Sequence, residues 1–556
     1  MTPGISSAGA RERVAPMSPG TAPARPGVRL ASAATIVKLR RGVLALSAAA
    51  IALQLALFFD PANLAVSALL LAGNVLGYGY ALRQTTLRRY PISSLMVLGY
   101  VFSYFTLPPL GQLVGLQPVV HHLHYPIDDE TYALAGLLAL IGAHVLYSKT
   151  PVLLALRGTL RRQFYGRLGF FRTPRLAQLW LMGLLGVVAV VAGRHYDVHS
   201  AGITQAVMQG LRPFVYMPYI TLLLPAWSVA RRIPRMHYLG LVAYSGLLLI
   251  LAMVVNSRAY LLMGFASLGI AYVYLLAVGS MALPSVRPRN VLLAVLALLV
   301  VAGPVTDLSM AMVLVRGQRS DLSPLQLAGA TWDTFREGGV SERFQQLMDR
   351  ISGGTGVNEA YFDNLFLNRL ANLKFVDNAV INKSALTPTG VDYFARIESQ
   401  KVWSILPAPL IHLLGLDADK QRVTSGSSGD FLLYAASGNG SVIGGFRQGS
   451  LLVNLDVVFG WLWPLVLLVF AALVFAVVDA WCQPAPAATS NEWVVRFNPL
   501  VLGLLFSEMF FFTSAATGVE SVAGMAGVLM RGWLQLGVLY AMAFWLSRIA
   551  TAGRRA

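Results

Sequence analysis

The feature that most constrains the fold is a series of apolar blocks, each about as long as the roughly 20 residues that a helix needs to cross a bilayer. Short connections separate the blocks, and most of the Arg residues lie in these connections. Only 12% of the 556 residues are charged, whereas a soluble protein is typically about a quarter charged. The pattern predicts an all-α, polytopic membrane helix bundle.

We predict twelve spans, with both chain termini in the cytoplasm. They cover residues 43–59, 62–82, 93–107, 132–147, 176–192, 207–229, 238–255, 260–278, 291–312, 451–478, 500–513 and 522–546. This topology places every Arg-rich short loop on the cytoplasmic side, as the positive-inside rule requires. The net charge of +18 is therefore a topology signal and predicts no nucleic-acid surface.

A long polar stretch, residues 313–450, interrupts the apolar blocks after the ninth predicted span. It holds 13 Lys or Arg and 13 Asp or Glu. Aromatic residues are scattered through it, which indicates a folded domain and not a linker. We expect four parts: a disordered basic cytoplasmic tail (1–37), spans one to nine (38–312), a large, mostly helical outer domain (313–450) and spans ten to twelve (451–556).

Within the polar stretch, apolar residues recur at helical spacing over 341–351, 361–376 and 391–405. These segments predict three helices, the last of which could lie on the membrane interface. Residues 424–447 are rich in Gly and Ser and show no clear period. They predict a long loop, and long loops in compact proteins are often functional.

Several classes of site are excluded or disfavoured. Walker loops, dinucleotide fingerprints and nucleophile elbows in the right context are all missing from the sequence. The single cysteine, Cys482, excludes an intramolecular disulfide and a cysteine-based metal centre. The His and acidic residues of the loop at 121–130 could bind a divalent metal, but a polar outer loop beside a helix start explains them as well. We predict no metal and no cofactor.

Arginines at the predicted outer boundary are the most informative side chains. Arg258 stands between the seventh and eighth spans with almost no loop. A charge at membrane depth is costly and marks a functional hypothesis, and a guanidinium can hold a phosphate through two bonds. Arg212, in a proline-rich span, and Arg447, before the tenth span, stand at similar positions. Together they predict a pocket for a lipid-linked pyrophosphate. Arg258 could instead reach the lipid headgroups or pair with an acid of the polar stretch, and Arg212 could form a structural pair. Arg369 and Arg396 are further candidates, although each could be an ordinary surface residue of a helix.

The candidates for a general base on the outer face are Asp430, Glu359, Asp363 and His195. Such a base would take the proton from a sugar hydroxyl that attacks an anomeric carbon. The arginines could then stabilise the departing pyrophosphate without a metal. Asp430 could alternatively be an ordinary turn residue.

Two short motifs carry a family resemblance. Residues 256–262 read NSRAYLL at the start of a span, and residues 447–450 read RQGS ahead of VVFGW at 457–461. Arg258 and Gly269 also fit an R-x10-G spacing. With many spans, both ends inside and one large outer domain late in the chain, the sequence resembles the Wzy-type polymerases of O-antigen and exopolysaccharide repeat units. The resemblance covers most of the chain from about residue 40.

The resemblance implies a metal-independent, GT-C-type glycosyltransferase of the bacterial inner membrane. It would move a growing glycan from one undecaprenyl-pyrophosphate carrier onto a new lipid-linked repeat unit at the periplasmic face. The implied partners are the lipid-linked oligosaccharide, bilayer lipids, a chain-length regulator and other polysaccharide-assembly proteins. Arg258 would fit the phosphate-binding role.

Other functions stay open. An O-antigen ligase of similar fold would use His195 or His412 as its base. A flippase or other transporter of lipid-linked oligosaccharides fits twelve spans, although transporters usually contain repeated halves and the sequence has no evident repeat. A sensor or scaffold would not need buried arginines.

Overall fold

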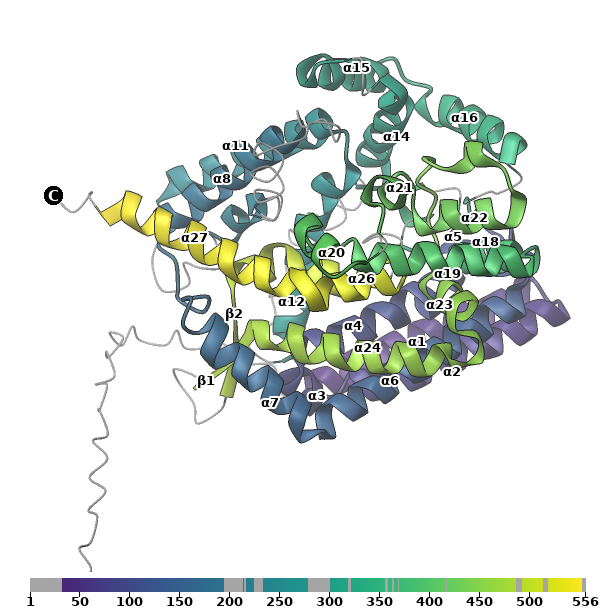
Figure 1. Cartoon of the computed structure of the whole chain (residues 1–556), viewed down its shortest axis with the longest axis horizontal. Helices are drawn as coiled ribbons and strands as arrows, with labels where there is room; N and C mark the ends of the chain where they lie inside the picture. Colours follow the sequence, from purple (N-terminus) through teal and green to yellow (C-terminus); the bar gives the residue numbers. More distant parts are fainter. Residues whose placement is uncertain are drawn as a thin grey trace, which may run out of the picture.

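The computed structural model describes residues 33–194, 214, 217–224, 234–278, 301–318, 322–355, 359–362, 365–368, 370–416, 418–486, 493–513 and 519–552. Within these ranges the chain is predominantly helical, and its two strands form one antiparallel hairpin (Figure 1). Six helices are long and apolar enough to cross a membrane. The predicted all-α class with spanning helices is confirmed to this extent, and the count of twelve spans stays a prediction.

The six helices of spanning length are Pro61–Ala81, Pro91–Val114, Pro126–Lys149, Arg235–Val255, Leu451–Trp481 and Val522–Thr551. The elements before the polar stretch are α1 (Ala33–Leu57), α2 (Pro61–Ala81), α3 (Gln84–Arg89), α4 (Pro91–Val101), α5 (Leu107–Val114), α6 (Pro126–Lys149), α7 (Pro151–Thr159), α8 (Leu176–Arg194), α11 (Arg235–Val255) and α12 (Arg258–Ala277). The predicted tail and the predicted span at 207–229 lie largely outside the described residues.

The polar stretch and its approach contain α14 (Thr306–Leu314), α15 (Pro324–Arg336), α16 (Val340–Thr355), α17 (Leu365–Asn368), α18 (Leu373–Ser384), α19 (Pro388–Trp403), α20 (Ala408–Leu413), α21 (Lys420–Thr424) and α22 (Ser428–Ser437). The elements after it are α23 (Leu451–Phe459), α24 (Trp463–Val478), β1 (Cys482–Pro486), β2 (Trp493–Phe497), α25 (Phe506–Phe510), α26 (Val522–Gly527) and α27 (Trp533–Ala552). The helices predicted at 341–351 and 391–405 are confirmed as α16 and α19. The hairpin of β1 and β2 was not predicted.

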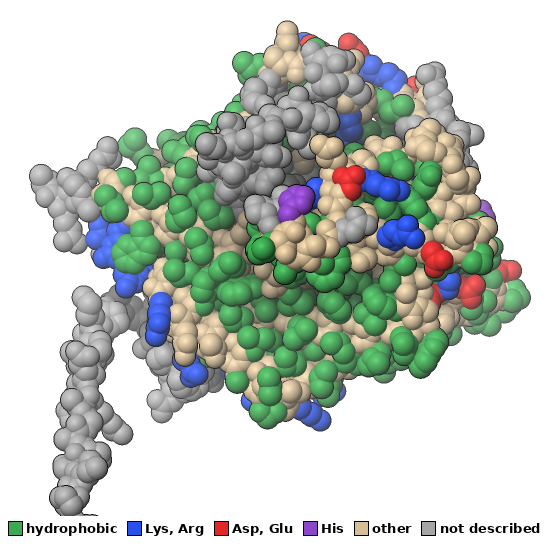
Figure 2. All heavy atoms as spheres, viewed as in Figure 1, with side chains coloured by type: hydrophobic (Ala, Val, Ile, Leu, Met, Phe, Trp, Pro, Cys, Tyr) green, Lys and Arg blue, Asp and Glu red, His purple; other side chains and the backbone are tan. Residues whose placement is uncertain are grey.

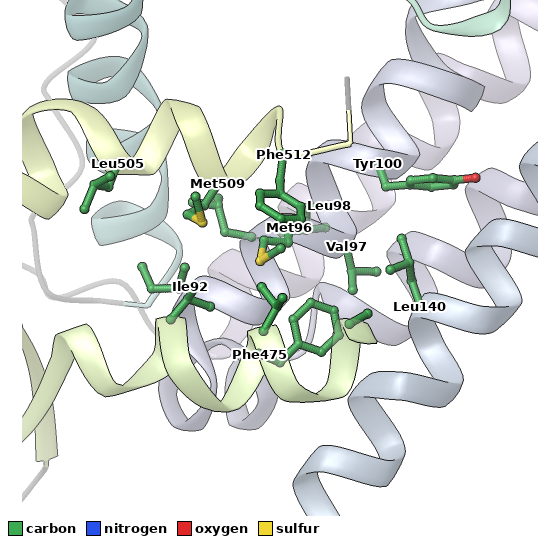
Figure 3. Close-up of a cluster of buried hydrophobic side chains, with 14 of the residues drawn as sticks. Ile92, Met96, Val97, Leu98, Tyr100, Leu140, Phe475, Leu505, Met509 and Phe512 are labelled. Atoms are coloured by element: carbon green, nitrogen blue, oxygen red, sulfur yellow. The ribbon is translucent and has the colours of Figure 1, made fainter. Parts of the chain in front are cut away.

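Helix α4 lies at the centre of the core. All of its residues are buried, and it contacts α2, α6, α24 and α25. Figure 3 shows Met96 and Val97 of α4 among side chains from these neighbours, with Phe475 of α24 and Met509 of α25 in the same cluster. A helix that is apolar on every face is stable only when other helices surround it, so α4 fixes where its neighbours pack.

A buried carboxylate fixes the first turn of α4. Asp479, just after α24, accepts hydrogen bonds through Oδ1 from the backbone N–H groups of Ile92 (2.9 Å) and Ser93 (3.1 Å). Its Oδ2 accepts from the hydroxyls of Ser93 (2.7 Å) and Tyr147 (3.0 Å). Free N–H groups at a helix start need such partners, and a carboxylate is favourable there. Asp479 therefore ties α4, α6 and α24 together at one end.

One predicted span boundary is wrong, and one predicted span contains an interruption that was not predicted. The helix predicted to end at 107 continues to Val114, because a π-helical segment (Phe102–Thr106) places Pro108 and Pro109 in the first turn of α5, where proline is tolerated. The span predicted at 451–478 corresponds to the helical stretch Leu451–Trp481. This stretch is interrupted at Gly460, whose φ of +56° and ψ of −143° are a conformation open essentially only to glycine. Trp461 beside the break is 85% exposed, as expected of an aromatic anchor at the membrane–water interface.

The helix predicted over 361–376 is also wrong, since the short α17 and a break precede α18. The cause is Asn368, whose side-chain oxygen accepts from the backbone N–H groups of Tyr361 (2.9 Å) and Phe362 (2.5 Å). Its amide nitrogen donates to the Phe362 carbonyl at 2.8 Å. Asn side chains compete with helical hydrogen bonds in this way, and here they replace helical bonds at Tyr361 and Phe362.

The loop predicted at 424–447 contains α22. Ser427 and Asp430 form a reciprocal capping box in which each side chain accepts from the other residue's backbone N–H. A capping box satisfies two of the N–H groups that a helix start leaves unpaired, so a Gly- and Ser-rich sequence still begins a helix here.

A buried ion pair joins the polar stretch to the loop before α6. Lys374 on α18 donates to Asp377 Oδ2 (2.6 Å) and to the His122 carbonyl (2.5 Å). Asp377 Oδ1 accepts from the backbone N–H groups of His124 (2.7 Å) and Tyr125 (3.0 Å). Burial alone would raise the pKa of Asp377, but the hydrogen bonds from Lys374 and the loop outweigh it and leave this pKa below its ordinary value. The His-rich loop thus serves as a docking point for α18.

Two acids of the same loop region are buried without partners. Asp129 and Glu130, in the first turns of α6, are both fully buried, and none of their four carboxylate oxygens has a hydrogen-bond partner. Their predicted position beside a helix start is confirmed, whereas their burial was not predicted. Among the described residues, no group of three His, Cys, Asp or Glu side chains could hold a metal ion.

The surface is divided by charge. Figure 2 shows a broad hydrophobic band with Lys and Arg along its lower-left border and a mixture of acidic and basic side chains along its upper-right border. The helices of the polar stretch lie on the mixed-charge side (Figures 1 and 2). This is the distribution expected of a helical bundle with one basic and one neutral face.

Candidate functional site

The candidate site is built on residues 446–449, which lead into α23. Asp430 of α22 accepts hydrogen bonds from the backbone N–H groups of Phe446 (2.7 Å) and Arg447 (3.0 Å). The Arg447 guanidinium lies 3.5 Å from the same carboxylate and donates to the Val442 carbonyl at 2.9 Å. Asp430 is fully buried. Both of its oxygens are therefore committed to holding this segment.

Two further carboxylates accept hydrogen bonds from backbone N–H groups of the 446–449 segment. Glu359 Oε1 accepts from the backbone N–H of Gln448 at 3.0 Å. Glu520, at the start of the last long helix, accepts from the N–H of Gly449 at 2.5 Å and from that of Ser428 at 3.1 Å. Four consecutive N–H groups thus donate to three carboxylates from separate parts of the chain, which fixes the path of the segment because charge-assisted hydrogen bonds are the strong ones.

A second layer of polar groups supports Ser428 at the start of α22. Its hydroxyl lies 2.6 Å from Glu398 Oε1 and 2.7 Å from Lys401 Nζ. The Lys401 ammonium is 3.6 Å from Glu398. Burial raises the pKa of Glu520, an effect that Lys401 and the two backbone hydrogen bonds partly oppose. These groups hold α19, α22 and the start of α26 in register.

A pocket opens beside this segment, between α18 and α22. Its polar lining consists of Glu359, Asn378, Asn382, Arg447 and Gln448. A second pocket adjoins it, sharing Gln448 and Gly449. Amides, a carboxylate and a guanidinium together offer both donors and acceptors, so the lining can form hydrogen bonds with hydroxyls and with an anionic group.

Close backbone packing under the pocket gives a prediction. A Cβ added to Gly429 would stand 2.6 Å from the Arg447 carbonyl oxygen and 2.8 Å from the Gln448 carbonyl carbon. Gly429→Ala should therefore lower the free energy of unfolding by about 1–3 kcal/mol, the usual cost of overpacking. Gly440→Ala, where the new Cβ meets nothing within 4 Å, is the matched control. Thermal unfolding of both variants checks this, and equal melting temperatures would contradict the packing described.

Three residues singled out from the sequence meet at this site. Asp430 and Arg447 are in contact, and Glu359 lines the pocket with Arg447. Arg258 begins α12, but its side chain lies outside the described residues. The predictions for Arg212, Arg369, Asp363 and His195 also fall outside them. His412, the alternative base, lies on the exposed face of α20.

Sequence reasoning missed Glu520, Asn378 and Asn382. Glu520 carries the same signal that pointed to Arg447, a charge directly before an apolar block. Its partner, Gly449, lies 71 residues away along the chain, and nothing in the local sequence indicates that contact. The two asparagines have no local signal, because Asn is common on helix surfaces.

Comparison of the chain with protein-family models, with curated proteins and with solved structures found no match.

Proposed function

We propose that this protein is a membrane glycosyltransferase that polymerises lipid-pyrophosphate-linked oligosaccharide repeat units at the periplasmic face of the bacterial inner membrane. The observation that carries the proposal is that Glu359 and Arg447 line one pocket with three amide side chains. A carboxylate and a guanidinium are the two groups that this transfer needs, one for the proton and one for the phosphate.

In the proposed reaction, the hydroxyl oxygen of the acceptor sugar forms a bond to the anomeric carbon of the donor glycan. The hydroxyl proton passes to the Glu359 carboxylate. The bond between the anomeric carbon and the pyrophosphate oxygen breaks, and its electron pair leaves with the lipid pyrophosphate, beside Arg447. The amides of Asn378, Asn382 and Gln448 would orient the sugar through its hydroxyls.

The sequence suggested Asp430 as a candidate general base, but its contacts indicate a structural role. Its oxygens accept from two backbone N–H groups of the 446–449 segment and from its own capping partner, and it contacts the Arg447 guanidinium. We therefore assign it to holding Arg447 in place, and we assign the base to Glu359.

The test is a reconstituted reaction. The purified full-length protein in lipid nanodiscs, given a synthetic lipid-pyrophosphate oligosaccharide, should yield products that differ by one repeat unit. No nucleotide sugar is needed, because the donor is already activated. Unchanged substrate length would overturn the polymerase proposal, and transfer of the intact glycan only to a different acceptor lipid would indicate the ligase alternative.

One observation favours a second candidate, a transporter of lipid-linked oligosaccharides. Asp129 and Glu130 are buried in a helix of spanning length without hydrogen-bond partners, and buried acids in membrane helices often mark proton relays. Proteoliposomes discriminate the two candidates. Movement of the labelled lipid across the bilayer without lengthening would favour the transporter, and Asp129→Asn should then abolish that movement.

A further inference from the structure

Helix α20 exposes an apolar face within the polar stretch. Leu410, Leu413 and Leu414 have the spacing that places side chains on one face of a helix, and they are 42%, 79% and 60% exposed. Ile411, which lies off that face, is buried. Residues 404–416 contain no Asp, Glu, Lys or Arg. Contiguous exposed apolar side chains of this kind mark an interaction surface.

The ends of α20 limit the number of unpaired backbone groups. The helix follows Pro407 and has a second proline in its first turn, and proline brings no N–H that would need a partner. At the other end, Gly415 has a φ of +61°. Its N–H donates to the His412 carbonyl at 3.2 Å, and the N–H of Leu416 donates to the Ile411 carbonyl at 3.0 Å. This pair of bonds is the Schellman motif, which satisfies carbonyls at a helix end. Hydrocarbon offers a backbone no other partners, so a helix capped in this way is suited to enter it.

The neighbours of α20 connect it to the membrane-spanning helices. It follows α19, whose Glu398 accepts from the Ser428 hydroxyl at 2.6 Å. The N–H of Ser428 donates to Glu520, just before the last long helix, at 3.1 Å. Helix α19 also packs against α26, the first part of that long helix. A hydrogen bond of 2.5 Å from Lys420 Nζ to the Leu406 carbonyl closes the loop that carries α20, so its position is fixed.

The exposed face of α20 is continuous with the apolar surface of the bundle. Figure 1 shows α20 beside α26, and Figure 2 shows that hydrophobic side chains cover much of this same side of the molecule. Trp403, at the end of α19, is 38% exposed, and Trp is enriched where a chain passes from water into a membrane.

We propose that Leu410, Leu413 and Leu414 insert into the leaflet of the bilayer nearest the polar stretch, so that α20 anchors this part of the chain to the lipid. The occupant is bilayer hydrocarbon, because the face is uncharged, its helix is capped and it continues the hydrophobic surface of the spanning helices. Short amphipathic helices lie in the membrane interface in this way. The anchor is separate from the pocket between α18 and α22 and does not depend on the proposed glycosyl transfer.

The test uses cysteine variants of the full-length protein in phospholipid nanodiscs that contain no polyprenyl lipid. The native Cys482 is buried, so a water-soluble maleimide reports on the added thiol. Leu413→Cys should react about tenfold more slowly than Ala385→Cys, because hydrocarbon excludes the thiolate that the reagent attacks. Ala385 is exposed between α18 and α19 and is the matched control. Equal rates would overturn the proposal.

Nitroxide labels on the same two cysteines identify what covers position 413. The Leu413→Cys label should collide more with oxygen, which concentrates in hydrocarbon, than with a water-soluble nickel chelate, and the Ala385→Cys label should show the reverse. Low accessibility to both reagents would indicate that protein covers the face, and it would overturn the assignment to the bilayer. Protection that appears only when a polyprenyl pyrophosphate is added would instead assign the face to the tail of a lipid-linked substrate. Both replaced side chains are exposed, so native melting temperatures should confirm that the variants fold.

Discussion

Replacing Glu359 with Gln is expected to slow glycan extension by about 100-fold or more, the usual contribution of a positioned general base. Gln keeps an Oε1 that can still accept the hydrogen bond from the Gln448 N–H, which is 3.0 Å from the carboxylate in the native protein. The 446–449 segment should therefore stay in place while the proton acceptor is lost. The rate of product lengthening at saturating acceptor measures the effect.

The matched control is Glu520→Gln. This carboxylate holds the same segment through Gly449 but is not part of the pocket lining that contains Glu359. Its replacement should lower the melting temperature, because an amide nitrogen would face one of two backbone N–H groups, and should change turnover of the folded fraction only a few-fold. If Glu359→Gln extended glycans at the native rate, Glu359 would have no place in the chemistry.

Replacing Asp377 with Ala is expected to lower the free energy of unfolding by about 3–5 kcal/mol, as removal of one partner of a buried ion pair does. Lys374 is 2% exposed and would be left as an uncompensated charge. The N–H groups of His124 and Tyr125 would also lose their acceptor. Thermal unfolding in detergent, monitored by circular dichroism, checks the loss.

The double variant Lys374→Met with Asp377→Leu tests the cause. Removing both charges leaves no unpaired ion, so part of the lost stability should return, while the cost of the two N–H groups without an acceptor remains. A double variant as unstable as Asp377→Ala would refute the ion-pair explanation. The contribution of Asp377 to the free energy of unfolding is expected to fall at low pH. Because the pKa of Asp377 is lowered in the folded protein, its contribution is complete above about pH 4, the ordinary value for Asp, and is lost as the pH falls through the folded-state pKa.

Hydrophobic patterning predicted much of the fold. The long helices correspond to apolar blocks of spanning length, and the 3.6-residue period predicted α16 and α19. Ser427 and Asp430 also fit the capping-box pattern that begins α22, so that helix was accessible to sequence reasoning. A loop was predicted instead because the segment is rich in Gly and Ser.

The errors have a common physical source. Asn368 prevents a predicted helix through side-chain bonds to Tyr361 and Phe362. Gly460 interrupts the helix of a predicted span with a backbone conformation that the hydropathy of the segment does not reveal. Hydrophobic periodicity indicates which face of an element is buried. It does not indicate where side-chain hydrogen bonds or a special backbone conformation interrupt a helix. For the site, residue type and position at a membrane boundary selected Asp430, Glu359 and Arg447, whereas the partner of Glu520 is a tertiary contact.

Three carboxylates hold the 446–449 segment by accepting hydrogen bonds from its backbone N–H groups. The backbone path of this segment therefore depends little on which side chains it carries. Phe446 and Gln448 offer their N–H groups to Asp430 and Glu359, and almost any amino acid supplies the same N–H. A different residue at 448 would alter what the pocket recognises while the loop kept its trace. In the proposed transfer, single exchanges there would change which sugar is preferred, with no redesign of the helices beneath.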